Sequence, residues 1–232
     1  MPGICGRVVN AAEGLALEEM LRERGARISY GGRPGRMIWQ ERPELSAEPA
    51  WVLDERYAGK SALDKIADVR EAMEKAHASV HVLTSLDDIA WLLNIRGNDI
   101  LYNPVVLSYA LVTMDQLYLF VNSSVLEGKS LSVSGGCKGH KREGVSGTDG
   151  RTVMPYDGGI RYGGGGLKNE KVLLEKCRVN YAVYRLIDGS NKVIDRMNPT
   201  ASMKAVKNDV EIENEKRAHI KDGVAMTKFI TG

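Results

Sequence analysis

The segment from Asn208 to Gly232 constrains the architecture most, because it predicts a helix that needs partners on two sides. Asn208 and Glu211 have the spacing of a helix capping pair, and the turns that follow are polar. Farther along, one side carries Ala218, Ala225 and Phe229, and the other carries Ile220 and Val224. A helix that is apolar on two sides is normally buried between other elements. Nothing follows Gly232 to bury it, so we expect this chain to be the front part of a larger protein.

Composition is typical of a globular protein and excludes several functional classes. The 232 residues, 43% hydrophobic and 27% charged, suffice for one large or two small domains. A net charge of +2 gives no electrostatic reason to expect nucleic acid or a membrane surface as partner. No apolar run approaches the roughly 20 residues of a membrane span, and the N-terminus lacks a signal-peptide pattern. Cys5, Cys137 and Cys177 are odd in number and far apart, which favours reduced thiols and a cytoplasmic location.

Capping residues and apolar spacing predict an α/β fold with a mixed sheet flanked by helices. Capping pairs begin at Asn10, Ser61 and Ser85, each before a helical apolar repeat. The helices expected are 10–24, 61–76, 85–97, 180–186 and 208–229, and the strands are 80–83, 105–112, 117–121, 171–174 and 192–194. Their order indicates a layer of strands with helices against it. Glycines and prolines in 31–50 predict connecting chain, with a short helical turn at 37–39.

Residues 128–166 differ from the rest of the chain. Thirteen of the 25 glycines lie there, including Gly163 to Gly166. Glycine costs roughly 0.5–1 kcal/mol inside a regular element relative to alanine. We therefore expect weak order in this stretch. A phosphate-binding loop would need a lysine followed by Ser or Thr after the glycines. Gly163-Gly-Gly-Gly-Leu-Lys-Asn lacks that pattern.

Histidines and acidic pairs are the first candidates for chemistry. His77 and His81 are four residues apart, a spacing that would let one helix bind a metal. No carboxylate lies between them and 80–83 favours a strand, so two unrelated surface or edge histidines are the better interpretation. Asp87 and Asp88 suit a helix N-terminus, where negative charge is favourable. Asp54 and Glu55 are expected to be solvated.

Cysteines and aromatic residues offer no stronger site. Cys137 has His140 nearby, but the glycine-rich surroundings would not hold the two in a fixed geometry. Cys177 lies between Lys176 and Arg178, which could lower its pKa, yet a plain free thiol explains it equally well. The aromatic residues Trp51, Trp91 and Tyr102 are expected in the core or an interface rather than in a stacking platform. The residues alone therefore predict no catalytic, cofactor-binding or metal-binding site.

Several longer blocks carry a family signature. The most distinctive is Ile89-Ala-Trp-Leu-Leu-Asn-Ile-Arg-Gly-Asn-Asp, followed by Tyr102-Asn-Pro-Val-Val-Leu-Ser-Tyr-Ala. The others are Ile38-Trp-Gln-Glu-Arg-Pro-Glu-Leu-Ser, Tyr57-Ala-Gly-Lys-Ser, Arg178-Val-Asn-Tyr-Ala-Val-Tyr, Met203-Lys-Ala-Val-Lys-Asn-Asp-Val-Glu and Arg217-Ala-His-Ile. In this order, over nearly the whole chain, they closely resemble cytosolic Xaa-Pro aminopeptidases (aminopeptidase P) of the creatinase/prolidase, or pita-bread, superfamily.

The resemblance implies an enzyme of two creatinase-like α/β domains followed by a pita-bread catalytic domain. It implies that 1–40 is the tail of the first domain, that 41–200 is the second domain, and that 201–232 is the first strand and helix of the third. The family's site holds two divalent metals, Mn or Zn, on two Asp, one His and two Glu. None of these metal-ligand motifs has a counterpart here. His219 is the only histidine in 201–232, and it lies in the opening helix rather than in a ligand motif. The resemblance further implies peptide substrates with proline second and a homodimer for the intact protein.

Residues 129–168 depart from the family, whose corresponding stretch is rich in Glu and Lys. Resemblance returns at Asn169-Glu-Lys-Val-Leu-Leu. A disturbed reading frame would explain this sharp loss and recovery, and a real insertion is the alternative. Residues 31–36 show a smaller departure.

Two functional hypotheses remain from the sequence. The first is a catalytically incompetent portion of a Xaa-Pro aminopeptidase, which would have no peptidase activity alone. The second is an interaction or oligomerisation module that uses the two-sided helix as its contact surface. A different activity, such as that of a creatine hydrolase, fits the matched blocks less well.

Overall fold

The computed structural model describes residues 4–29, 41, 48–121, 125 and 167–231, together with the backbone of 146–148, 161–162 and 165–166. Its helices are α1 (Ala11–Glu23), α3 (Glu55–Ala58), α4 (Ala62–Lys75), α5 (Leu86–Leu93), α6 (Tyr181–Arg185), α7 (Pro199–Ala205) and α8 (Asp209–Thr231). Its strands are β1 (Trp51–Val52), β2 (Val80–Leu83), β3 (Ile95–Arg96), β4 (Ser108–Thr113), β5 (Leu117–Val121), β6 (Ser146–Thr148), β7 (Arg161–Tyr162), β8 (Gly165–Gly166), β9 (Lys171–Leu174) and β10 (Lys192–Asp195). The turn expected at 37–39 and most of 128–166 lie outside the described residues.

A mixed six-stranded sheet forms the centre of the domain, in the order β10-β9-β2-β4-β5-β6. β10, β9 and β2 run parallel, while β4 is antiparallel to both β2 and β5. The β4–β5 hairpin turns at Thr113, whose amide donates to the Gln116 carbonyl over 2.9 Å. This confirms the mixed sheet and the hairpin predicted from the sequence.

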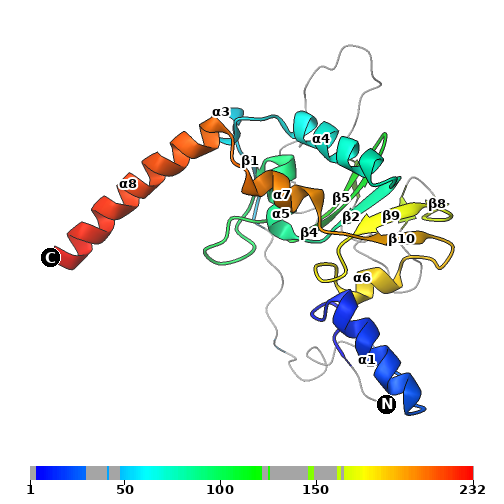
Figure 1. Cartoon of the computed structure of the whole chain (residues 1–232). Coiled ribbons are helices and arrows are strands. Elements are labelled where there is room, and N and C mark those ends of the chain that lie inside the picture. The colour runs from blue at the N-terminus through cyan, green and yellow to red at the C-terminus, as the bar shows by residue number, and fades with distance from the viewer. Residues whose placement is uncertain are drawn as a thin grey trace.

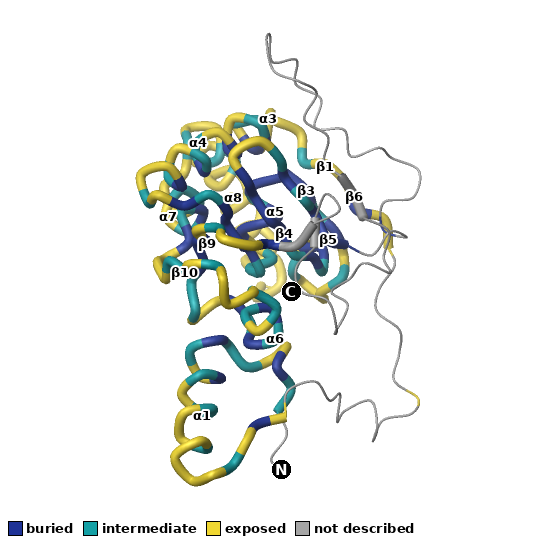
Figure 2. The backbone as a smooth tube through the Cα atoms, turned by 90° about the vertical axis from the view of Figure 1, so that its right-hand side faces the viewer, coloured by how far each residue is buried: buried dark blue, intermediate teal, exposed yellow. Residues whose placement is uncertain are grey.

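Alternating side chains give the sheet two apolar faces. On β9, Leu173 belongs to one buried cluster, whereas Val172 and Leu174 belong to the other. Helices α4 and α5 cover the first face, and α1 and α6 cover the second, below the sheet in Figure 1. Figure 2 shows the buried backbone gathered around β4, β5 and α5. This two-sided burial explains why the strands are rich in Val and Leu.

Side-chain caps begin the helices at most of the predicted positions. The Asn10 carboxamide accepts from the Glu13 amide over 2.9 Å, and the Ser61 hydroxyl accepts from the Asp64 amide over 3.0 Å. Ser85 is the N-cap residue of α5, as predicted, but its side chain makes no capping hydrogen bond. The same helix ends at Leu93 rather than near Gly97, since Asn94 takes a left-handed conformation.

The strand expected at the start of 201–232 is also wrong. Pro199 is the first residue of α7. At this position the absence of a backbone N–H in proline breaks no helix hydrogen bond. Thr200 is buried and Met203 packs against the core, so this segment is a helix of the domain. α8 follows it and extends from the domain as a long rod that ends at the C-terminus (Figure 1).

Candidate functional site

The base of α8 is held by a compact set of polar contacts. The Asn208 amide donates to Glu211 Oε2 over 3.0 Å, and its Oδ1 accepts from the Glu211 amide over 2.9 Å. This reciprocal pair is the capping box predicted from the sequence. Asn208 Nδ2 also donates to the Ala58 carbonyl over 2.9 Å, and Asn214 Nδ2 donates to the Arg56 carbonyl over 3.2 Å. The carbonyl groups of α3 are therefore hydrogen-bonded to the start of α8.

Gly59 makes this contact possible. It ends α3 with a φ of 68°, in the left-handed region that favours glycine. A Cβ atom at this position would overlap the Asn208 carboxamide. The short helix can therefore approach α8 closely only with glycine here.

Lys65 lies close to the same junction and is only 1% exposed. Its Nζ donates to Asn94 Oδ1 over 2.8 Å and to the Trp91 carbonyl over 3.0 Å, and it lies 4.5 Å from the centre of the Trp91 ring. Asn94 Nδ2 in turn donates to the Lys60 carbonyl over 3.0 Å. Buried cations are tolerated when their donors are satisfied in this way.

Burial lowers the pKa of Lys65 to about 8, while the Glu211 carboxylate opposes that decrease. Burial also lowers the pKa of Arg96, again opposed first by Glu211. The Glu211 carboxylate, in the first turn of α8, therefore favours the charged form of both Lys65 and Arg96. The Lys65 amine is covered by Trp91 and two of its three N–H groups donate to fixed acceptors, so its role is structural. We call Ala58, Gly59, Lys65 and Arg96, with Asn208 and Glu211, the α8 socket.

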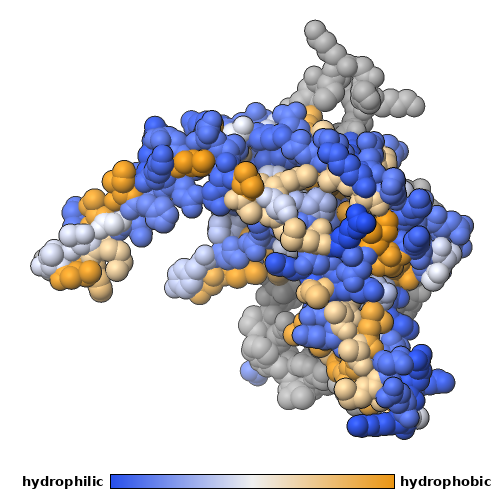
Figure 3. All heavy atoms as spheres, in the orientation of Figure 1, coloured by the Kyte–Doolittle hydropathy of each residue, from blue (hydrophilic) through white to orange (hydrophobic). Residues whose placement is uncertain are grey.

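Beyond the socket, α8 has no buried residue. Ile220 is 68% exposed and Phe229 is 84% exposed, although both are large and apolar. Figure 3 shows apolar side chains along the outer half of the rod, with open solvent on the side facing the domain. The apolar character predicted on two sides of this helix is therefore present and uncovered.

The two candidate histidines do not meet as metal ligands. His77 follows α4 with a φ of 55° and is exposed. His81 lies in β2 with no solvent exposure, and its Nδ1 is 3.0 Å from the Leu173 carbonyl. Burial lowers the pKa of His81 to about 4. The pair is unrelated, as interpreted, but the expectation of a surface or edge location is wrong for His81, because β2 lies in the middle of the sheet.

The acidic residues have structural partners. Asp87 is exposed in the first turn of α5, whereas Asp88 is buried and pairs with Lys204 Nζ over 2.8 Å. Asp88 therefore joins α5 to α7, which a helix-terminus explanation alone does not include. Asp54 caps α3 through the Arg56 amide at 2.9 Å, and Glu55 beside it is exposed, as expected.

The remaining candidates are dispersed. Cys177 is exposed, and its neighbours Lys176 and Arg178 pair with Asp195 and Glu175 over 3.6 and 3.8 Å. Trp91 packs against the core, while Trp51 and Tyr102 are exposed. His219 lies on α8 with Nε2 4.0 Å from Glu215 Oε1. Cys137, His140 and the first two glycines of the phosphate-loop candidate, Gly163 and Gly164, lie outside the described residues, whereas Leu167 is buried and Lys168 is exposed.

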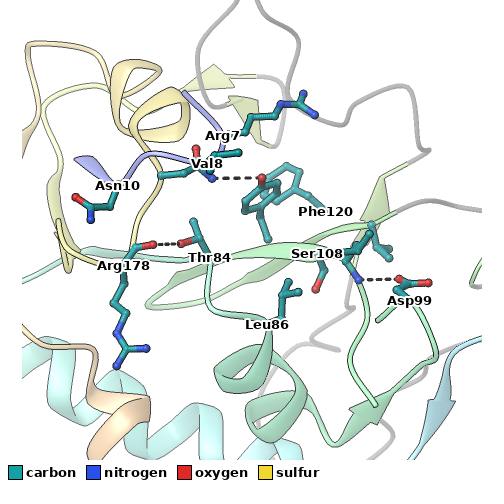
Figure 4. A pocket seen from close by; sticks show the side chains of 13 residues that line it. Arg7, Val8, Asn10, Thr84, Leu86, Asp99, Ser108, Phe120 and Arg178 are labelled. Carbon is teal, nitrogen blue, oxygen red and sulfur yellow. Dashed lines mark hydrogen bonds between the residues drawn. The ribbon is translucent and has the colours of Figure 1, made fainter. Parts of the chain in front are cut away.

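A cavity of about 400 Å³ lies where β2 and β5 end and α5 begins. Figure 4 shows the guanidinium groups of Arg7 and Arg178 pointing away from the other labelled side chains that line the cavity. The Thr84 hydroxyl donates to the Arg178 carbonyl over 3.2 Å, and Asp99 Oδ2 accepts from the Leu107 amide over 2.7 Å. These polar groups fix loops, and they do not form a set of nucleophile, base and oxyanion donor.

Within the part of the chain that the structure describes, no three His, Cys, Asp or Glu side chains gather as a metal site requires. Over the same residues, no helix combines the length and apolarity needed to cross a membrane.

Comparison with known proteins gives this domain its family. Residues 41–211 match the creatinase/prolidase N-terminal domain family. The chain belongs to this family. It is 37% identical over 199 residues to a probable Xaa-Pro aminopeptidase P of Laccaria bicolor, covering 83% of this chain and 29% of that protein. It is 35% identical over 191 residues to Xaa-Pro aminopeptidase 1 of Dictyostelium discoideum, covering 82% and 28%.

A solved structure supports the same family assignment. The X-prolyl aminopeptidase of Caenorhabditis elegans, described as a cytosolic enzyme with a di-nuclear active site, matches with a TM-score of 0.81 and 27% identity. That match covers 98% of this chain and 36% of the other. The chain therefore spans about a third of the length of its relatives and has their fold over that part.

Sequence reasoning missed the socket of this creatinase-like domain. Lys65 precedes Ile66 on the expected helix and is not part of the apolar repeat that predicts the buried face of that helix. Its partner Asn94 is 29 residues away, so no local pattern could connect the two. The sequence did signal the Asn208–Glu211 capping pair, and Gly59 stands within one of the family blocks, but nothing in the sequence connected the two.

Proposed function

We propose that this chain is a non-catalytic N-terminal and middle portion of a metal-dependent Xaa-Pro aminopeptidase. The parent activity is release of an N-terminal residue that precedes proline. One observation carries the proposal: homologous aminopeptidases match 82–83% of this chain but only 28–29% of their own length. The family's dinuclear centre, formed by two Asp, one His and two Glu, fits no cluster among the described side chains. We assign that centre, and the two Mn or Zn ions it would hold, to the part of the relatives that this chain does not match.

In this proposal the chain supports the catalytic part mechanically. The α8 socket sets the direction in which α8 leaves the domain, through the Asn208–Ala58 hydrogen bond and the charge of Glu211. Asp88 and Lys204 attach the preceding helix α7 to α5. In this proposal, holding α8 rigidly fixes the orientation of the catalytic part relative to the sheet. Preorganised geometry of this kind is what a substrate-binding site built from several domains requires.

The assay is direct. Purified residues 1–232 with Mn²⁺ or Zn²⁺ should release no amino acid from an Arg-Pro-Pro peptide, because no described residue cluster can hold the metal. Metal-dependent release of the first residue at a rate above that of buffer would contradict the proposal. The cytosolic location and the homodimer implied for the parent enzyme belong to the same proposal, supported by the cytosolic C. elegans relative for location alone.

A second candidate function is a stand-alone interaction module. The exposed apolar half of α8 favours it, since Ile220, Phe229 and Ile230 are all more than two-thirds exposed. Such a module would bind without hydrolysing peptides. Binding of a protein unrelated to aminopeptidases through α8 would support it over the first candidate.

A further inference from the structure

A group of buried polar side chains lies where β2, α5 and α7 meet, apart from the α8 socket and from the cavity in Figure 4. His81, Asp88, Asn198 and Thr200 are each at most 3% exposed. Burying a polar group is unfavourable unless it finds a hydrogen-bond partner. Asp88 meets this condition, because Lys204 Nζ donates to it over 2.8 Å and Asn198 Nδ2 donates to it over 3.5 Å.

Three buried atoms of this group have no hydrogen-bond partner among the described residues: His81 Nε2, Asn198 Oδ1 and Thr200 Oγ1. His81 Nδ1 lies 3.0 Å from the Leu173 carbonyl, and because a carbonyl only accepts, Nδ1 carries the hydrogen. Burial keeps the His81 ring neutral, with a pKa of about 4, so its Nε2 is an acceptor. The group therefore presents two acceptors and one hydroxyl that can both donate and accept.

The His81 ring lies beside Asp88 and Asn198. His81 alternates along β2 with Val80 and Val82, which pack on the opposite face of the sheet, so its ring is on the face that α4 and α5 cover. Burial lowers the pKa of His81, and the Asp88 carboxylate opposes that decrease, so this carboxylate is close to the ring. Asn198 Nδ2 donates to the same carboxylate.

Thr200 lies on the face of α7 that points toward this group. Met203 and Lys204 follow it by three and four residues, a spacing that puts all three side chains on one face of the helix. Met203 packs against the core, and Lys204 pairs with Asp88 of α5, which lies beside α7 in Figure 1. The Thr200 hydroxyl is therefore buried on the side of α7 that faces Asp88.

Water is the ligand that suits this set of atoms. A cation has no net negative charge to attract it, since Lys204 already pairs with Asp88, and an anion would be repelled by that carboxylate and by two acceptors. A water molecule both donates and accepts, and buried waters make about three hydrogen bonds to groups that have no other partner. We propose that His81 Nε2, Asn198 Oδ1 and Thr200 Oγ1 bind one buried water, which links α7 to the central strand β2. This site is independent of the proposed function.

High-resolution crystal structures of the wild type and of two variants test the site. In the wild type we expect one water within about 3.2 Å of all three atoms. The double variant His81→Phe/Thr200→Val keeps the size of both side chains and leaves one polar partner, fewer than the two to four that a buried water needs, so the water should be lost. The control Thr113→Val removes a buried hydroxyl in the β4–β5 turn and should leave the water in place.

The wild-type structure decides the question even if the double variant does not fold. A direct hydrogen bond from Thr200 to His81 Nε2, with no water between them, overturns the proposal, and so does a water that reaches only one of the three atoms. Distances of about 2.0–2.6 Å to the two oxygens would identify a cation instead and would also overturn it. Retention of the water at full occupancy in the double variant would show that His81 and Thr200 do not hold it.

Discussion

At the residue scale, burial decides the behaviour of the ionisable groups more than their neighbours in sequence do. His81 lies in the central strand β2 with no solvent exposure, and it remains neutral because charging it without solvent is unfavourable. Lys65 is buried to the same degree but keeps three favourable partners, two acceptors and an aromatic face. The sequence predicts a surface or edge location for His81 and gives no signal for the burial of Lys65.

His81 should make the stability of the protein depend on pH below neutrality. Its pKa is about 4 in the folded state against 6.5 ordinarily, so the unfolded chain binds a proton first as the pH falls. The free energy of unfolding should therefore drop between pH 6.5 and 4, by about 3 kcal/mol from this group. Urea unfolding of the wild type and of His81→Leu over this range measures the difference. Parallel pH profiles for the two proteins would show that His81 does not titrate as described.

At the scale of elements, local sequence patterns correctly predicted the features that depend on contacts a few residues apart. The predicted caps at Asn10, Ser61 and Asn208 depend on atoms three residues apart, and all three form. The strand expected after residue 200 failed because tertiary burial of Thr200 and Met203 favours α7. The α8 socket could not be predicted, since Gly59 and Asn208 come together across about 150 residues of chain.

Gly59→Ala should loosen α8 from the domain. The new Cβ would overlap Asn208, and a left-handed alanine adds about 1 kcal/mol of strain. Gly25→Ala is the matched control, because Gly25 has the same φ of 68° and nothing within 4 Å of an added Cβ. Hydrogen exchange should accelerate in residues 209–214 for Gly59→Ala and stay unchanged there for Gly25→Ala. Equal exchange in both variants would mean that the socket does not fix the helix.

At the scale of the whole molecule, the described residues form a sheet domain from which the uncovered helix α8 extends. The mixed sheet, its flanking helices and the family were predictable, because alternating strands and long blocks such as Ile89 to Asp99 are specific. The domain limits at 40 and 200 stay predictions.

The most direct measurement of the central claim is the peptidase activity of a chimera in which residues 1–232 replace the matched 36% of the C. elegans X-prolyl aminopeptidase. If this chain is the supporting portion of a Xaa-Pro aminopeptidase, the chimera should release the first residue of an Arg-Pro-Pro peptide in a Mn²⁺- or Zn²⁺-dependent manner. The chain alone, and the C. elegans remainder without residues 1–232, should both be inactive under the same conditions. A folded chimera without activity, or a chain that is active by itself, would contradict the account.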